Sequence, residues 1–477
     1  MKKLIKGCSA LVWKEDSHSL LEDAFIVLEN NSIRSWGKMD RLEEHDGDFD
    51  ETIEANNYFV CPGFLNIHSH IYNQPTRKGF GNDWGNENFY GSALYDNSGL
   101  FELSKEESKI CGAHSIGEML KKGTTTMVEI GYNSQWYEDV VQNLGIRAYL
   151  VPGYRSSSWG SIEGRKVAYE WDEESGREGM KKNIEYVKKC NSNSDSKINS
   201  LLGPAQIDTC TKELLRKTAE KAEELDCRIQ IHAAQTLKEF EIILERHGLT
   251  PIEYLKETGI LGTNCIIAHS VFTNAHPATN YPYGNDLELL SESGSHIAHC
   301  PWVFARSGDI LHSFGKYLEE GINMGIGTDT NPLDIIAEMK WAAVGSKIAD
   351  RNFASVTVED VINAATIGGA KALGRGDLGK IAPGGKADMI FVDLDDFDMS
   401  PTRDPVKNFI YLAGSKAIDK VMVDGEFVVE DGNVKYLDEE KITNEVREIA
   451  ERVWGDIPEN DKEGRTANEI YPRAFLD

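Results

Sequence analysis

The sequence predicts an α/β fold in which a (β/α)8 TIM barrel is joined to a small β-sandwich built from both termini. Between residue 60 and about residue 370, short apolar runs alternate with longer helical stretches, which is typical of parallel strands connected by helices. On either side of this region, short strands follow one another with turn residues between them. With 477 residues, the chain is long enough for one large domain and one smaller domain.

The composite sandwich domain is predicted to comprise residues 1–60 and 375–436. The segment Glu29-Asn30-Asn31 lies between two short apolar runs, and asparagine tolerates the positive φ that a tight hairpin turn requires. Similar turn residues separate the strands near the other end of the chain. The strand candidates are residues 24–28, 32–36, 53–60, 386–392 and 419–425.

The barrel is predicted to comprise residues 61–374. Its first strand ends at His68, and helices are expected at residues 105–122, 212–225 and 287–293. In a barrel, the carboxyl ends of all strands meet at one rim, so residues from distant parts of the chain come together there. The other strand candidates are residues 124–129, 147–151, 198–202, 227–232, 265–269, 295–299 and 323–327.

Two further segments have distinct compositions. Residues 71–100 are rich in asparagine, glycine and aromatic residues, and a loop of this length is typical of an active-site lid. Residues 437–477 form a charged tail in which apolar residues recur at steps of three and four, which predicts an amphipathic helix. We expect this tail to pack against a neighbouring subunit in a homo-oligomer.

The composition of the chain indicates which binding partners and which cellular compartment to expect. The net charge of −27 comes from 51 basic and 78 acidic residues and disfavours binding to nucleic acid or anionic membranes, so we expect a small-molecule substrate. The eight cysteines include no Cys-x-x-Cys pair, which indicates a reducing compartment. Neither a signal peptide nor an apolar run of the ~18 residues needed to span a membrane is recognisable. We therefore expect a cytoplasmic protein.

Histidine residues recur where the predicted strands end. His68 and His70 are one residue apart, so their side chains point to the same side of a strand. His232, His269 and Asp329 occupy comparable positions on later strands. Imidazole and carboxylate groups together suit Zn²⁺, Fe²⁺ or Mn²⁺. The spacing therefore predicts a metal site at the rim of the barrel.

At these positions the chain resembles the amidohydrolase superfamily, and in particular its branch of triazine hydrolases and nucleobase deaminases. The resemblance covers nearly the whole chain. It rests on the segments Pro62-Gly63-Phe64-Leu65-Asn66-Ile67-His68-Ser69-His70, His232, Ala268-His269-Ser270, His299-Cys300-Pro301, Gly327-Thr328-Asp329-Thr330 and Leu378-Gly379-Lys380-Ile381-Ala382-Pro383-Gly384-Gly385-Lys386-Ala387-Asp388.

The resemblance implies a site with one divalent metal, zinc in the first place and iron or manganese as alternatives. Its implied ligands are His68, His70, His232 and Asp329. Binuclear relatives carry a carboxylated lysine at the end of the fourth strand, whereas residues 201–206 contain no lysine. The implied catalytic groups are Asp329, which transfers a proton from the metal-activated water, and His269, which polarises the carbonyl of the substrate.

The sequence departs from the deaminase pattern at Gln235. Deaminases of this branch resemble His-x-x-Glu there, and an amide cannot replace a carboxylic acid as proton donor to a ring nitrogen. We therefore predict hydrolysis of an amide, urea or carbamate-like bond, with an aminohydrolase that releases ammonia from an N-heterocycle as the alternative. The expected substrate contacts are Gln235, His299, Trp302 and Arg155, although Trp302 suits core packing equally well and Arg155 suits a structural ion pair.

Overall fold

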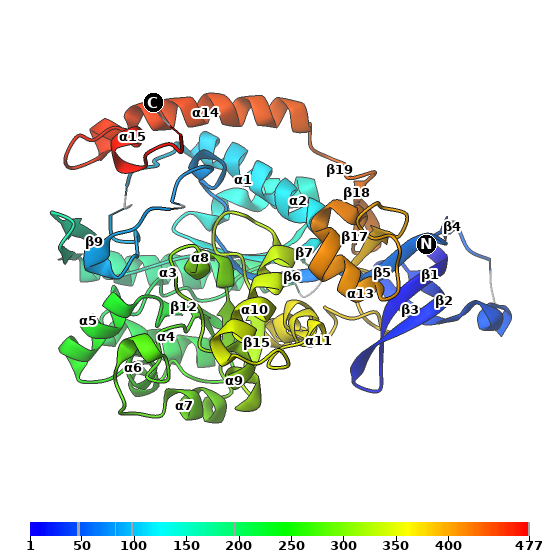
Figure 1. Cartoon of the computed structure of the whole chain (residues 1–477), viewed down its shortest axis with the longest axis horizontal. Helices are drawn as coiled ribbons and strands as arrows, with labels where there is room; N and C mark the ends of the chain where they lie inside the picture. Colours follow the sequence, from blue (N-terminus) through cyan, green and yellow to red (C-terminus); the bar gives the residue numbers. More distant parts are fainter. Residues whose placement is uncertain (45–47, 82, 97–98, 194–195, 476–477) are drawn as a thin grey trace.

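The computed structural model is an α/β protein and describes residues 1–44, 48–81, 83–96, 99–193 and 196–475 (Figure 1). Strands from both termini lie side by side at one end of the molecule, and the alternating strands and helices of the central part occupy the rest. Among the described residues, no helix combines the length and the apolar character needed to cross a membrane.

The two termini share one nine-stranded sheet, in the order β19-β18-β17-β16-β5-β1-β2-β3, with β4 pairing with β1. Residues 386–392, expected to be a strand, contribute β16, which pairs antiparallel with β5 and so joins the two halves of the sheet. The turn at Glu29-Asn30-Asn31 connects β2 and β3, and Asn30 has φ of 55°, as the hairpin requires. The strands are β1 (Lys2–Lys14), β2 (Ser17–Glu29), β3 (Ser32–Lys38), β4 (Glu51–Glu54), β5 (Tyr58–Pro62), β16 (Met389–Asp393), β17 (Ile418–Val423), β18 (Glu426–Glu430) and β19 (Asn433–Val434).

The central part contains two four-stranded parallel sheets, ordered β11-β8-β7-β6 and β12-β13-β14-β15. Their strands are almost entirely buried, which explains why they appear in the sequence as continuous apolar runs. The strands are β6 (Phe64–Ser69), β7 (Thr124–Gly131), β8 (Arg147–Pro152), β11 (Ile198–Asn199), β12 (Ile229–Ala233), β13 (Cys265–His269), β14 (His296–His299) and β15 (Asn323–Ile326).

Isolated parallel bridges connect the edges of these two sheets. Ser69, at the end of β6, bridges to Asp329, which follows β15. At the other edge, Leu202 bridges to Ile229 and Gln206 bridges to His232. The segment that carries Leu202 and Gln206 was expected to form a full strand. Only Ile198 and Asn199 do so, and the residues that follow make isolated bridges in place of a continuous ladder.

Helices surround the parallel strands, and most begin at a side-chain cap. Ser104 and Glu107 form a capping box at the start of α1, and Thr236 caps α5 immediately after β12. The helices are α1 (Lys105–Lys121), α2 (Glu138–Leu144), α3 (Glu173–Cys190), α4 (Lys212–Leu225), α5 (Leu237–His247), α6 (Pro251–Thr258), α7 (Asp286–Ser293), α8 (Pro301–Ala305), α9 (Phe314–Glu319), α10 (Ile335–Asp350), α11 (Val358–Asn363), α12 (Gly369–Leu373), α13 (Pro405–Lys407), α14 (Glu439–Asn460) and α15 (Ala467–Ile470).

The C-terminal tail forms α14, which lies beside α1 across the top of Figure 1. Its apolar face, which includes Ile442, Val446, Ile449 and Val453, is buried with Phe101 in one hydrophobic cluster of the same chain. Trp454 Nε1 also donates a hydrogen bond to the carbonyl of Thr76 at 2.8 Å. The apolar face therefore covers its own chain, and the expectation that it packs against a neighbouring subunit was wrong.

A two-stranded antiparallel hairpin, β9 (Ser157–Ile162) and β10 (Lys166–Trp171), follows β8 and was not expected from the sequence. Its aromatic residues Trp159 and Tyr169 pack in a cluster with Tyr95 from the long loop at residues 71–100. The hairpin thus supports this loop on one side, while α14 supports it on the other.

Candidate metal centre and active-site cavity

Three histidines present the same ring nitrogen to a common point. Nδ1 of His70 donates to the carbonyl of Ile130 at 2.6 Å, and Nδ1 of His232 donates to the carbonyl of Ala205 at 2.5 Å. Nδ1 of His68 lies 3.2 Å from Oε1 of Gln230. These contacts hold the hydrogen on Nδ1 and leave Nε2 as an electron-pair donor, which is how proteins orient metal-binding histidines. Ligand atoms of the three rings lie within 4.8 Å of one another.

The carboxylate of Asp329 completes this cluster. Its Oδ1 lies 3.3 Å from Nε2 of His70 and 3.6 Å from Nε2 of His68. The backbone secures the arrangement, because the amide N–H of His70 donates to the carbonyl of Asp329 at 2.8 Å. Nε2 of His232 lies only 3.3 Å from Nε2 of His70. Two nitrogen lone pairs at this separation favour a cation between them.

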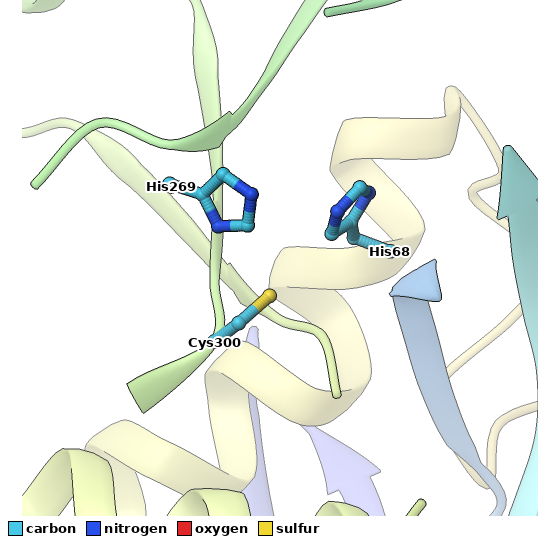
Figure 2. Close-up of side chains that lie close together, drawn as sticks. All are labelled: His68, His269 and Cys300. Carbon is cyan, nitrogen blue, oxygen red and sulfur yellow. The ribbon is translucent and has the colours of Figure 1, made fainter. Parts of the chain in front are cut away.

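His269 lies at the end of β13 and is buried beside the cluster, with its ring centre 5.0 Å from that of His68 and 5.4 Å from that of His232. Neither of its ring nitrogens has a hydrogen-bond partner among the described residues. Its φ of 85° is unusual for a non-glycine residue and is typical of functional sites. Figure 2 shows His68, His269 and Cys300 facing a common space, and their ligand atoms also lie within 4.8 Å of one another.

Burial and mutual proximity favour neutral imidazoles in this cluster. Burial lowers the pKa of His68, lowers that of His232 well below the usual value, and lowers that of His269 to about 3. Burial also opposes protonation of His70, but the adjacent carboxylate of Asp329 outweighs it and raises the pKa of His70. Burial would raise the pKa of Asp329, yet the adjacent imidazoles of His68 and His70 hold it well below the usual value. Neutral nitrogens and an ionised carboxylate are the forms that bind a divalent metal.

The cluster opens into a cavity of about 940 Å³. His70, His232 and Asp329 line it, and so do three of the expected substrate contacts, Gln235, Trp302 and Arg155. The long loop contributes Tyr72, Phe80, Trp84 and Tyr90 to its wall. His68 and His269 lie behind this lining.

The remaining expected contacts have mixed surroundings. His299 lines a separate cavity of about 10 Å³ with Phe314, so this geometry gives it no route to a substrate in the large cavity. The guanidinium of Arg155 lies 4.6 Å from the ring centre of Tyr132 and has no carboxylate within 4 Å among the described residues. Oε1 of Gln235 is buried and has no hydrogen-bond partner in the described part of the chain.

Several residues of the site were not recognised from the sequence. Gln230, which contacts His68, precedes His232 by two residues and therefore lies on the same side of β12, a periodicity that could have identified it. Arg77, Arg306 and Tyr471 line the cavity from three separate segments. No sequence spacing relates those three, since only the packing of the tail and the long loop brings them together.

Comparison with known proteins agrees with this geometry. Residues 59–428 match the model of the Amidohydrolase family. The chain belongs to the Amidohydrolase family. It is 30% identical over 95% of its length to the whole of a 5-methylthioadenosine/S-adenosylhomocysteine deaminase from Acetivibrio thermocellus, and 27% identical over 95% of its length to the whole of a protein of that name from Halothermothrix orenii.

A crystal structure of an adenosine deaminase from Xanthomonas campestris with bound zinc shares the fold, with a TM-score of 0.81 and 21% identity over 94% of this chain and 98% of the other. As a member of the Amidohydrolase family, this protein is a hydrolase that acts on carbon–nitrogen bonds. The expectation of such an enzyme from the histidine positions is therefore confirmed.

Proposed function

We propose that this amidohydrolase is a zinc-dependent aminohydrolase that releases ammonia from an amino-substituted N-heterocycle. The observation that carries the proposal is similarity along 95% of the chain to relatives named as nucleoside deaminases. This favours the alternative that the sequence left open over hydrolysis of an amide or urea.

The metal would be held by His68, His70, His232 and Asp329. Their donor set of three imidazole nitrogens and one carboxylate oxygen suits zinc, and the unpartnered, fully buried Nε2 of His68 is consistent with a missing cation. When bound, such an ion supplies Lewis-acid chemistry and lowers the pKa of a coordinated water to about 7. Cys300 lies near His68 and His269, but burial holds the pKa of its thiol well above the usual value, so we do not include it among the ligands.

The residues of this chain would then position the substrate and move protons. Asp329 accepts the proton of the attacking water and passes it to the leaving amino group. His269 is neutral because burial lowers its pKa to about 3, so its N–H can donate a hydrogen bond that orients the oxygen attacking the ring carbon. The amide of Gln235 donates to a ring nitrogen and orients the heterocycle. Trp302 and the aromatic residues of the long loop exclude water from the ring.

A second candidate, hydrolysis of an amide, urea or carbamate-like bond, is favoured by Gln235. An amide side chain cannot supply the proton that a ring nitrogen takes up before ammonia leaves, whereas a polarised carbonyl requires none. The same cluster serves both reactions, so the two proposals differ only in the group that faces Gln235.

Product analysis with the zinc-loaded enzyme separates these candidates. We would measure ammonia release from a panel of aminopurines, aminopyrimidines and aminotriazines, and amine release from aryl amides and phenylureas. The proposal expects ammonia from at least one heterocycle and no amine above background. Amine release from amides or ureas alone would replace the proposal with the second candidate. Asp329→Asn serves as the control that must abolish either activity.

Two further proposals concern the closure of the barrel and the boundaries of the domains. The two four-stranded sheets are proposed to form one closed (β/α)8 barrel, which the bridges Ser69–Asp329 and Leu202–Ile229 at their edges support. The domains are proposed to be residues 61–374 for the barrel, residues 1–60 with 375–436 for the composite β domain, and residues 437–477 for the tail.

A cytoplasmic location is proposed because all eight cysteines are buried and unpaired, as in a reducing compartment. We also propose that the protein forms a homo-oligomer, with an interface that does not use the apolar face of the C-terminal tail. The mass of the protein in solution tests this.

A further inference from the structure

Two arginines line the same cavity as the metal cluster. Arg77 ends a short turn of helix in the long loop, and Arg306 directly follows α8. Burial lowers the pKa of Arg306, and the nearby positive charge of Arg77 lowers it further. The negative charges of Asp329 and Glu338 act in the opposite direction. Tyr471, from the C-terminal tail, lines the cavity and lies within the electrostatic reach of both guanidinium groups.

Neither guanidinium is neutralised at short range. Among the described residues, no carboxylate lies within 4 Å of Arg77 or Arg306, although the chain carries 78 acidic residues. Among the described residues, Arg306 makes two long hydrogen bonds, at 3.4 Å, to the carbonyl of Asn331 and the hydroxyl of Thr330. Arg77 lies over the ring of Phe101, 5.0 Å from its centre. Partly buried charges of this kind normally have a partner, because leaving them unpaired is costly.

Three acidic groups near the two arginines, Asp329, Glu338 and Glu118, are engaged elsewhere. Asp329 belongs to the histidine cluster. Burial holds the pKa of the Glu338 carboxyl well above the usual value, which disfavours its negative charge. One of its oxygens also accepts the N–H of Trp302 at 2.9 Å. Glu118, which also lines the cavity, is paired with Lys78 at 3.0 Å. Arg77 and Arg306 therefore remain available to a ligand, as does Arg155, which lines the same cavity.

We propose that Arg77 and Arg306 form an anion subsite that binds a carboxylate or phosphate group of the substrate while its amino-heterocycle faces the metal cluster. This inference rests on the proposed function and adds the substrate class to it. Guanidinium groups bind both anions through charge-assisted hydrogen bonds, which are stronger in a partly buried wall than in water. The cavity of about 940 Å³ has room for a heterocycle and an extended anionic substituent.

Matched substrates test the subsite. With the zinc-loaded enzyme, kcat/KM would be measured for adenosine, for its 5′-carboxylate and for its 5′-phosphate, and the two anions distinguish which group the subsite prefers. We expect at least one anion to exceed adenosine by about tenfold or more, as a charge-assisted contact allows. Arg306→Gln and Arg77→Gln should each remove most of this preference, mainly through KM. Lys78→Gln, which removes a cation already paired with Glu118, should leave the ratio within about twofold.

Direct binding separates failure of the subsite from failure of the proposed function. Calorimetry with inorganic phosphate and with succinate on the zinc-loaded enzyme needs no turnover, and the double variant Arg77→Gln/Arg306→Gln should weaken binding about tenfold or more. If the panel is inert but this loss is observed, the subsite stands and the deaminase proposal does not. If adenosine and its anions react equally, or phosphate and succinate bind equally to parent and double variant, the subsite is overturned. Arg306→Lys, which keeps the charge, distinguishes lost charge from misfolding.

Discussion

Oδ1 of Asp329 lies 3.3 Å from Nε2 of His70, at the place where the edge of one parallel sheet meets the edge of the other. The amide N–H of His70 also donates to the carbonyl of Asp329 at 2.8 Å, so backbone and side chains meet at the same point. A residue from the beginning of the central part and one from its end are thereby fixed against each other. The proposed metal site consequently depends on contact between these two sheet edges.

Removal of either partner should release the metal. We expect His70→Ala and Asp329→Ala each to lower the zinc content of the purified protein from about one to well below one ion per chain, because each removes one of four proposed ligands. Elemental analysis after dialysis against a weak chelator measures this. His18→Ala is the matched control, since His18 lies outside the cluster and contacts Thr366 instead. Full zinc content in both cluster variants would contradict the proposed ligand set.

Zinc affinity should increase as the pH rises. In the metal-free protein, the carboxylate of Asp329 outweighs burial and raises the pKa of His70, so at any pH below that pKa a proton must leave this ring before the metal binds. Below that pKa the apparent association constant should rise about tenfold per pH unit, and above it the dependence from His70 should level off. Competition with a chromophoric chelator between pH 6 and pH 9 measures the curve.

The same titration in Asp329→Asn gives the contrasting case. Without the carboxylate of Asp329, only Glu129 and the carbonyl of Ile130 oppose the effect of burial on His70, so its pKa should fall and the pH-dependent part of the curve should move to lower pH. A curve of unchanged position would show that Asp329 does not control the protonation of His70.

The site residues that follow the periodicity of a strand could be predicted from the sequence. His68, His232 and His269 could be recognised because a histidine that closes a buried parallel strand has few places to point except the rim. Arg77 and Arg306 follow no such rule, since they sit in a loop and after a short helix whose positions are set by tertiary packing. The fourth strand was predicted too long for a related reason, because apolar character at Leu201 and Leu202 does not reveal that the continuous ladder ends at Asn199 and that only isolated bridges follow.

Gln235→Glu should increase ammonia release from a heterocycle. A carboxylic acid at this position can protonate a ring nitrogen, and general acid catalysis of this kind is worth about 10²–10⁴-fold when well positioned. Oε1 of Gln235 is buried, which would raise the pKa of the glutamic acid and keep it protonated near neutral pH. Steady-state kcat for ammonia release measures the effect, and Gln235→Leu should lower it. An unchanged or reduced kcat in Gln235→Glu would favour the amide or urea reaction.

Arg147 should be essential for stability although it lies outside the histidine cluster and the cavity. It is 1% exposed on β8 and its Nη2 contacts Asp424 at 2.7 Å and Asp388 at 3.3 Å, which ties the parallel strands to the nine-stranded sheet. Arg147→Met would leave the buried carboxylate of Asp388 without this cation and Asp424 with only the distant Lys197 at 3.9 Å, and removal of one partner of a buried pair typically costs about 3–5 kcal/mol. Urea unfolding measures the loss. Arg177→Met, which breaks an exposed pair with Glu174 at 2.8 Å, should cost far less, so equal losses in the two variants would contradict the role assigned to Arg147.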